Sequence, residues 1–135
     1  MSLKWLLLFK TDKTKIMNSS ANQTQITSQI KAGILTRLVG QIFPFRGSNK
    51  RIERLIKWWR DGITYPTDFD LSNIATNGSI TISVEFDLWV SIDLDGNSKP
   101  TGTVNGYLDN IVIGFSTPDY YVDLSNAVIT RLSIK

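Results

Sequence analysis

The clearest pattern in the chain is a strict alternation of apolar and polar residues from Ile80 to Leu94. A side-chain period of two is the period of a β-strand, so this stretch predicts one long strand with an apolar and a polar face. At about 3.3 Å per residue the strand would be roughly 45 to 50 Å long, which favours a bend or a bulge. Its apolar face has to be covered by other elements of the chain.

Two stretches before this strand have the spacing of a helix. From Asn22 to Ile42, isoleucine or leucine recurs about every four residues, which predicts a helix with one apolar stripe. The stretch from Ser48 to Asp61 has apolar residues at i, i+3, i+4 and i+7, with Gly62 placed to end the element, and predicts a second helix. Pro44 and Gly47 break the helical pattern between them.

Two further strands are predicted after the long one. The segment Thr103 to Phe115 has apolar residues on both faces, which is typical of a central strand. From Tyr120 to Ile134 the alternation returns, and an interruption between Leu124 and Ala127 predicts a bulge or a break. The expected fold class is α+β with two layers, in which two N-terminal helices pack on a C-terminal antiparallel β-meander of three to four long strands.

We expect one domain over residues 1–135, because no repeat or linker divides the chain. Residues 1–21 are interpreted as a mobile N-terminal segment, 22–62 as a basic helical half and 63–135 as an acidic β-sheet half. From Met1 to Gly62 the chain has twelve Lys and Arg and three Asp and Glu, a net charge of +9. The remainder has three cations and nine carboxylates, a net charge of −6. Either the halves attract each other within the fold, or the basic half faces an acidic partner.

The composition excludes several kinds of chemistry. The chain has no Cys and no His, and therefore no disulfide, no thiolate nucleophile and no imidazole general base. Since no catalytic motif is present either, we expect a protein that is not an enzyme and that holds no cofactor and no metal. Asp93, Asp95 and Asn97 have the spacing of the first ligands of an EF-hand, but Ser98 and Val104 stand where that loop needs Gly and Glu. An Asp-Gly hairpin turn explains this segment better.

The most informative candidate site is the basic face of the second predicted helix. Its cations suit phosphate-bearing surfaces, and its indole suits a membrane interface or stacking on bases. The predicted anionic-surface site consists of Lys50, Arg51, Arg54, Lys57, Trp58 and Arg60. The alternative interpretation is an ordinary solvated helix face.

A second candidate is an apolar foot near the N-terminus, formed by Trp5, Leu6 and Phe9 between basic residues. Such a foot can insert shallowly into an acidic membrane surface. The alternative is a buried N-terminal strand or first helical turn. The apolar run is too short to span a bilayer, and no small-residue cleavage site follows it, so a secretory signal is not expected.

The polar face of the long strand carries a third candidate, formed by Glu85, Asp87 and Trp89. Residues at i and i+2 of a strand lie roughly 7 Å apart, a spacing at which paired carboxylates beside an aromatic platform can hydrolyse glycosides. Such a pattern also arises by chance on any exposed sheet face. We favour a protein–protein contact, because an indole on a polar face requires a cover.

These features favour a non-catalytic structural or binding protein. Its basic half would dock on an anionic surface, an acidic membrane rather than nucleic acid, because its tryptophans are interfacial residues and no nucleic-acid motif is present. Its sheet half would self-associate, giving a homo-oligomer, or bind a protein partner. The expected location is cytoplasmic, peripheral to a membrane, or in a virion. In character the chain is similar to viral matrix and capsid-associated proteins, although no motif matches.

The alternative hypothesis is a carrier of an apolar ligand or lipid. A helix followed by long amphipathic strands, over residues 22–135, resembles lipid-binding folds in which a curved sheet wraps a helix, the tubular lipid-binding proteins among them. That resemblance implies a bound apolar ligand. An accessory subunit of a larger complex is a third interpretation.

Overall fold

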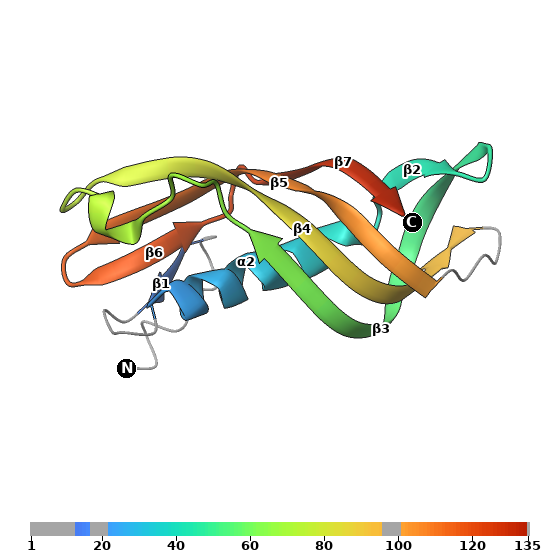
Figure 1. Ribbon diagram of the computed structural model, residues 1–135, viewed down its shortest axis with the longest axis horizontal. Coiled ribbons are helices and arrows are strands. Elements are labelled where there is room, and N and C mark those ends of the chain that lie inside the picture. The colour runs from blue at the N-terminus through green and yellow to red at the C-terminus, as the bar shows by residue number, and fades with distance from the viewer. Residues whose placement is uncertain (1–12, 17–21, 96–100, 135) are drawn as a thin grey trace.

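The computed structural model describes residues 13–16, 22–95 and 101–134 of the chain (Figure 1). This part of the chain forms one α-helix, a 3-10 turn and a seven-stranded sheet. In chain order the elements are β1 (Lys13–Ile16), α2 (Asn22–Leu38), β2 (Ile42–Phe45), β3 (Ser48–Thr64), the 3-10 turn η1 (Leu71–Asn73), β4 (Ser79–Leu94), β5 (Thr101–Ser116), β6 (Asp119–Asp123) and β7 (Val128–Ile134). The fold is α+β, but with one helix and a larger sheet than the predicted meander.

The sheet is antiparallel and has the strand order β1-β6-β5-β4-β3-β2, with β7 beside β5. In Figure 1 it curves strongly around α2, so that its shape approaches a barrel, and β2 comes close to β7. β1 and β6 lie at one end of the molecule, and the β2–β3 hairpin lies at the other. The core fills the space between the concave face of the sheet and α2.

α2 confirms the first predicted helix, and its apolar stripe supplies much of the core. Ile26, Ile30, Ile34 and Leu38 recur every four residues, and none of the four side chains is exposed. Their burial contributes roughly 6 to 12 kcal/mol of hydrophobic free energy. The helix ends at Leu38 rather than at the predicted residue 42, because Gly40 adopts a φ of 93° that turns the chain toward β2.

β4 confirms the long alternating strand. Every even-numbered residue from Val84 to Leu94 is buried, while the odd-numbered residues from Ser79 to Trp89 are exposed. The expected irregularity falls on the neighbouring strand instead. Ile82 pairs with Ile111 and Val84 pairs with Leu108, so β5 advances by three residues where β4 advances by two. β4 therefore runs unbroken between β3 and β5.

The second predicted helix is wrong, because residues 48–61 belong to β3. Three residues of β3 spaced by three pair with three residues of β4 spaced by two: Ile52 with Leu94, Leu55 with Ile92, and Trp58 with Val90. Successive register shifts, each typical of a β-bulge, add the extra residues to β3. The resulting spacing of three is close to the 3.6-residue period of a helix, which explains the misleading pattern. The segment around Pro44, expected only to separate two helices, forms β2.

β5 is a central strand, as predicted. It pairs with β4 along one edge and with β6 and β7 along the other. The predicted interruption separates β6 from β7, and Arg37 of α2 occupies it. Its Nη2 donates to the Leu124 carbonyl at 2.7 Å, and its Nε donates to the Ala127 carbonyl at 3.2 Å. Two carbonyl groups outside the strand ladder are thereby hydrogen-bonded to the helix.

Close contact between α2 and the sheet at this point depends on Gly33. A Cβ atom at Gly33 would lie 2.5 Å from Leu124 Cδ1, which is closer than real Cβ contacts allow. The absent side chain lets the helix reach the segment between β6 and β7, where Arg37 makes its hydrogen bonds.

The predicted mobile N-terminal segment includes one strand. Lys13–Ile16 pairs with β6 as β1, so this part of the chain belongs to the sheet. The rest of residues 1–21 lies outside the described residues. The predicted Asp-Gly turn falls partly outside them, because Gly96 belongs to the undescribed residues 96–100. The strands on either side of these residues pair antiparallel, with Ser91 opposite Thr101.

Candidate functional site

The β2–β3 hairpin presents a cation at its tip. Arg46 and Gly47 form the two-residue turn with φ values of 51° and 83°, the positive values that a tight hairpin turn needs at both positions. Arg46 is exposed, and its guanidinium carbon lies 4.9 Å from the centre of the Phe45 ring. Figure 1 shows the hairpin at one end of the molecule. Sequence reasoning missed Arg46, because Gly47 was the only signal of this turn.

The bulges of β3 bring its cations onto one face. Arg54 and Lys57 are exposed and pair with Asp93 and Ser91, which belong to the polar outer face of β4. Cross-strand neighbours share a face of the sheet. In a regular strand, residues three apart would point to opposite faces. The irregular strand thus gathers the cations that a helix had been expected to gather, and Arg51 at the same spacing is exposed as well.

The remaining predicted members of the basic site are placed differently. Lys50 stands opposite Phe43 in the hairpin and is half-buried. Trp58 and Arg60 hold register positions opposite Val90 and Trp89, and their side chains lie outside the described part of the structure. The predicted apolar foot, Trp5, Leu6 and Phe9, also lies outside it.

Carboxylates near the end of β4 offset part of this positive charge. Arg54 Nε donates to Asp93 Oδ2 at 3.1 Å, and the backbone N–H of Arg51 donates to Asp95 Oδ1 at 3.0 Å. From Arg46 to Lys57 the chain carries five cations, and Glu53 together with these two Asp residues supplies three carboxylates, which leaves a net charge of +2. The unbalanced charge lies toward the hairpin, with Arg46, Lys50 and Arg51.

Exposed aliphatic side chains lie beside these cations. Ile42 is 56% exposed and stands opposite Arg51 in the hairpin. Val39 is 47% exposed just before the hairpin, and Ile56, in the bulged part of β3, is 46% exposed. A single exposed aliphatic residue is ordinary, but several among cations form the mixed surface that suits a membrane interface. The sequence pattern had placed Ile42 and Ile56 on apolar helix faces.

The predicted contact residues Glu85, Asp87 and Trp89 form a row on the outer face of β4. All three are exposed, and 42% of Trp89 is accessible to solvent. Their neighbours on β5 are Tyr107, Asn105 and Thr103. The alternation of β4 had predicted that these three side chains share a face, and the structure brings them together. What covers Trp89 remains a prediction.

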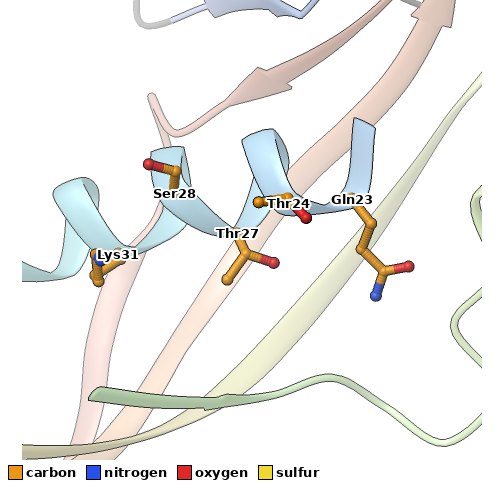
Figure 2. A pocket seen from close by; sticks show the side chains of 5 residues that line it. All are labelled: Gln23, Thr24, Thr27, Ser28 and Lys31. Atoms are coloured by element: carbon orange, nitrogen blue, oxygen red, sulfur yellow. The ribbon is translucent and has the colours of Figure 1, made fainter. Parts of the chain in front are cut away.

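A polar groove of about 620 Å³ runs along the first turns of α2 (Figure 2). It is lined by Gln23, Thr24, Thr27, Ser28 and Lys31. Thr27 Oγ1 lies 2.6 Å from the Tyr65 hydroxyl, and burial raises the pKa of Tyr65 while this hydrogen bond partly opposes the shift. These side chains offer hydrogen bonds to a polar ligand. The sequence predicted only the apolar stripe of this helix, and the groove on its polar side was missed.

Neither metal chemistry nor a family relationship identifies a site. Among residues 13–16, 22–95 and 101–134, no group of three or more Asp or Glu side chains is placed to hold a metal ion. Within the same residues, no helix has the length and apolarity needed to cross a bilayer. Comparison of the chain with protein-family models, curated proteins and solved structures finds no match. The function has to be inferred from the surfaces of the molecule itself.

Proposed function

We propose that this protein is a non-catalytic binding protein that docks on acidic membrane surfaces through its β2–β3 hairpin and self-associates through the outer face of its sheet. The observation that carries the docking role is the juxtaposition of Ile42 and Arg51. They are cross-strand partners at the projecting end of the molecule, and both are exposed. A peripheral membrane location follows from this role.

The exposed aliphatic residues favour a membrane over nucleic acid. Cations bind the phosphates of either partner, but nucleic-acid surfaces are bound by aromatic stacking and hydrogen bonds rather than by aliphatic side chains. Ile42 and Val39 lie beside the hairpin cations and are about half exposed. Aliphatic groups beside cations are what an interfacial element presents to acyl chains and acidic headgroups.

The expected affinity of one hairpin is modest. Each Lys or Arg near an acidic surface contributes about 1 kcal/mol, so Arg46, Lys50 and Arg51 contribute about 3 kcal/mol. Burying the exposed halves of Ile42 and Val39 adds about 2 kcal/mol. A total of roughly 5 kcal/mol corresponds to sub-millimolar binding, and two hairpins acting together bind far more tightly.

Vesicle cosedimentation tests the docking role. The variant Arg46→Glu/Arg51→Glu should bind vesicles of phosphatidylserine and phosphatidylcholine at least roughly 30-fold more weakly, because two contacts of about 1 kcal/mol each are lost. Ile42→Ser should weaken binding by roughly fivefold, through the loss of about 1 kcal/mol of apolar burial. Pure phosphatidylcholine vesicles should bind none of these proteins well.

The matched control is Lys31→Glu/Arg131→Glu, which changes the net charge by the same amount on α2 and β7. It should bind acidic vesicles like the wild type. Equal losses in both double variants would show that binding follows net charge rather than the hairpin, and would overturn the proposed site. Retention on single-stranded nucleic acid without vesicle binding would favour the nucleic-acid alternative.

A carrier of an apolar ligand is the second candidate, because the sheet curves around α2 (Figure 1). The side chains of Ile26, Ile30, Ile34 and Leu38 already occupy the concave face and are fully buried. An apolar ligand in that position would have to displace the helix. Native mass spectrometry that finds a co-purified lipid on the protein would favour this candidate over the docking role.

A further inference from the structure

The two faces of the β2–β3 hairpin carry different side chains. Residues that pair directly share a face, and Ile42 and Arg51 belong to the face that carries the docking role above. Phe45 and Ser48 belong to the opposite face, called the inner face here. We propose that the inner face binds the phosphate of a lipid headgroup, so that the hairpin prefers phosphatidate, a phosphomonoester lipid, over phosphatidylserine. The inference names the lipid for the proposed docking role and rests on that role.

Three groups that bind phosphate belong to the inner face. Ser48 pairs with Phe45 across the hairpin, and Lys50 stands two residues further along the same strand. Residues two apart in a strand share a face, so the hydroxyl and the ammonium group both lie on the inner face. Arg46 follows Phe45 in the turn, and its guanidinium lies over the Phe45 ring. The inner face therefore presents a guanidinium, a hydroxyl and an ammonium group.

The position of the guanidinium is fixed from the core outward. Phe43 is buried in the core, and the Phe45 ring meets it edge to face with the ring centres 6.1 Å apart. The guanidinium carbon of Arg46 lies 4.9 Å from the centre of the Phe45 ring. A cation already held on a ring loses little conformational freedom on binding. A planar guanidinium also offers two parallel N–H groups to one phosphate.

One phosphate beside the Ser48 hydroxyl can contact all three groups. Lys50 is about 7 Å further along the strand, a distance that its four-carbon side chain covers. Arg46 is separated from Ser48 by a single glycine, and its side chain lies against the cross-strand neighbour of Ser48. Both exposed side chains, Arg46 and Ser48, are accessible at the end of the molecule that Figure 1 shows projecting.

The cations of the inner face have no carboxylate partner. Within the part of the chain that the structure describes, neither Arg46 nor Lys50 forms an ion pair. Arg54, further along β3, by contrast donates to Asp93 at 3.1 Å. The positive charge of the inner face is therefore not offset by a neighbouring side chain, and a headgroup phosphate can neutralise it.

Phosphatidate presents the phosphate that suits these groups best. Its phosphomonoester has three free oxygens and carries between one and two negative charges near neutral pH. The phosphate of phosphatidylserine is a diester with one charge, and the serine attached to it adds an ammonium group. Three groups that converge on one phosphate gain more from the monoester, whereas scattered cations respond only to the total charge of the membrane.

Cosedimentation with vesicles of matched surface charge tests the preference. Phosphatidate and phosphatidylserine are each mixed with phosphatidylcholine to the same measured zeta potential. The wild type should bind the phosphatidate vesicles at least roughly fivefold more tightly, because the monoester offers one more charge-assisted contact. Equal binding to both would overturn the inference and leave the docking role intact. Failure to bind either kind of acidic vesicle would remove the docking role and the inference together.

Substitutions on the two faces locate the phosphate. Lys50→Gln should bring the two affinities to within roughly twofold of each other, and Ser48→Ala should reduce the preference by a smaller factor. Arg46→Lys keeps the charge but loses the planar guanidinium, so it should keep most of the binding to phosphatidylserine and lose most of the preference.

The matched control is Arg51→Gln, which removes one charge from the opposite face of the same hairpin. It should weaken binding to both kinds of vesicle by the same factor, roughly fivefold, and keep the preference for phosphatidate. An equal loss of preference in Arg51→Gln and Lys50→Gln would show that the inner face does not select the phosphate, and would overturn the proposed site.

Glycerol 3-phosphate separates a lipid site from a site for a soluble phosphate ester. It carries the same phosphomonoester without acyl chains. At about 0.1 mM it should not displace the protein from phosphatidate vesicles, because three polar contacts alone bind only in the millimolar range. Displacement at that concentration would assign the site to a soluble ester and overturn the lipid as its ligand.

Discussion

β3 and β4 are neighbouring strands of seventeen and sixteen residues, but β3 is interrupted by bulges and β4 pairs regularly. β4 is paired along both edges and alternates strictly between buried and outward positions. β3 pairs with β4 along one edge, whereas β2 covers only Ser48–Arg51 on the other. Beyond Arg51 the structure describes no strand on that edge, so extra residues disturb only one ladder.

The difference shows what an irregular edge strand can contribute. Its bulges increase the local twist, which helps the sheet to curve around α2. They also place Arg54 and Lys57 on the outer face, opposite residues of β4. Bulges and the missing N–H of Pro44 make the free edges poor templates for another strand. The outer face is therefore better suited than the edges to the self-association that we propose.

Deletion of Asp87 from β4 should have the largest effect on the contrast between the two strands. β4 pairs one-to-one with both neighbours at this point, and the deletion makes the inward residues Phe86 and Leu88 adjacent, so one part of the strand must turn over. Apolar side chains would leave the core and polar ones would enter it. We expect a loss of at least about 4 kcal/mol in the free energy of unfolding, measured by urea denaturation.

The control is deletion of Ile56 from β3. It removes the extra residue of a bulge and leaves Leu55 opposite Ile92 and Lys57 opposite Ser91, so both keep their faces. This deletion should cost no more than about 2 kcal/mol in the free energy of unfolding. If the two deletions have similar effects, the one-to-one pairing of β4 does not fix which residues face the core.

An intermediate effect is expected from Leu88→Ala in β4, where the alternation leaves the side chain fully buried. The truncation should cost about 2 to 5 kcal/mol through lost burial and the cavity left behind. Ser83→Ala, on the exposed face of the same strand, should cost less than about 0.5 kcal/mol. Similar values for the two variants in urea denaturation would contradict the division of β4 into two faces.

The ion pair that joins the two strands should have the smallest effect. Arg54 and Asp93 form it at the surface, where solvent screens the attraction. A double-mutant cycle with Arg54→Ala and Asp93→Ala should give a coupling free energy of about 0.2 to 1 kcal/mol, reduced at high salt. A larger coupling that persists in salt would mean that this pair, rather than the core, fixes the register of β3.

The candidate surfaces were predicted only in part. The grouping of Glu85, Asp87 and Trp89 followed from the alternation of β4. Arg54 and Lys57 were also predicted to lie together, but on the face of a helix, and that helix is wrong. A spacing of three residues occurs both in a helix and in a strand that bulges at each step. The exposure of Ile42 was not predicted, since it depends on a hairpin read as a helix end.

The sequence by itself determined the elements whose periodicity is local: the isoleucine stripe of α2, the alternation of β4, the interruption between β6 and β7, and the division of charge at Gly62. Only the tertiary structure decided that residues 48–61 form a strand, and that the cations Arg54 and Lys57 of this strand lie beside the polar outer face of β4. The spacing of apolar residues identifies a strand only where each of its residues pairs with one residue of the neighbouring strand. The bulges of β3 arise from its fit to β4 and to the curvature around α2, which involves residues far apart in the chain.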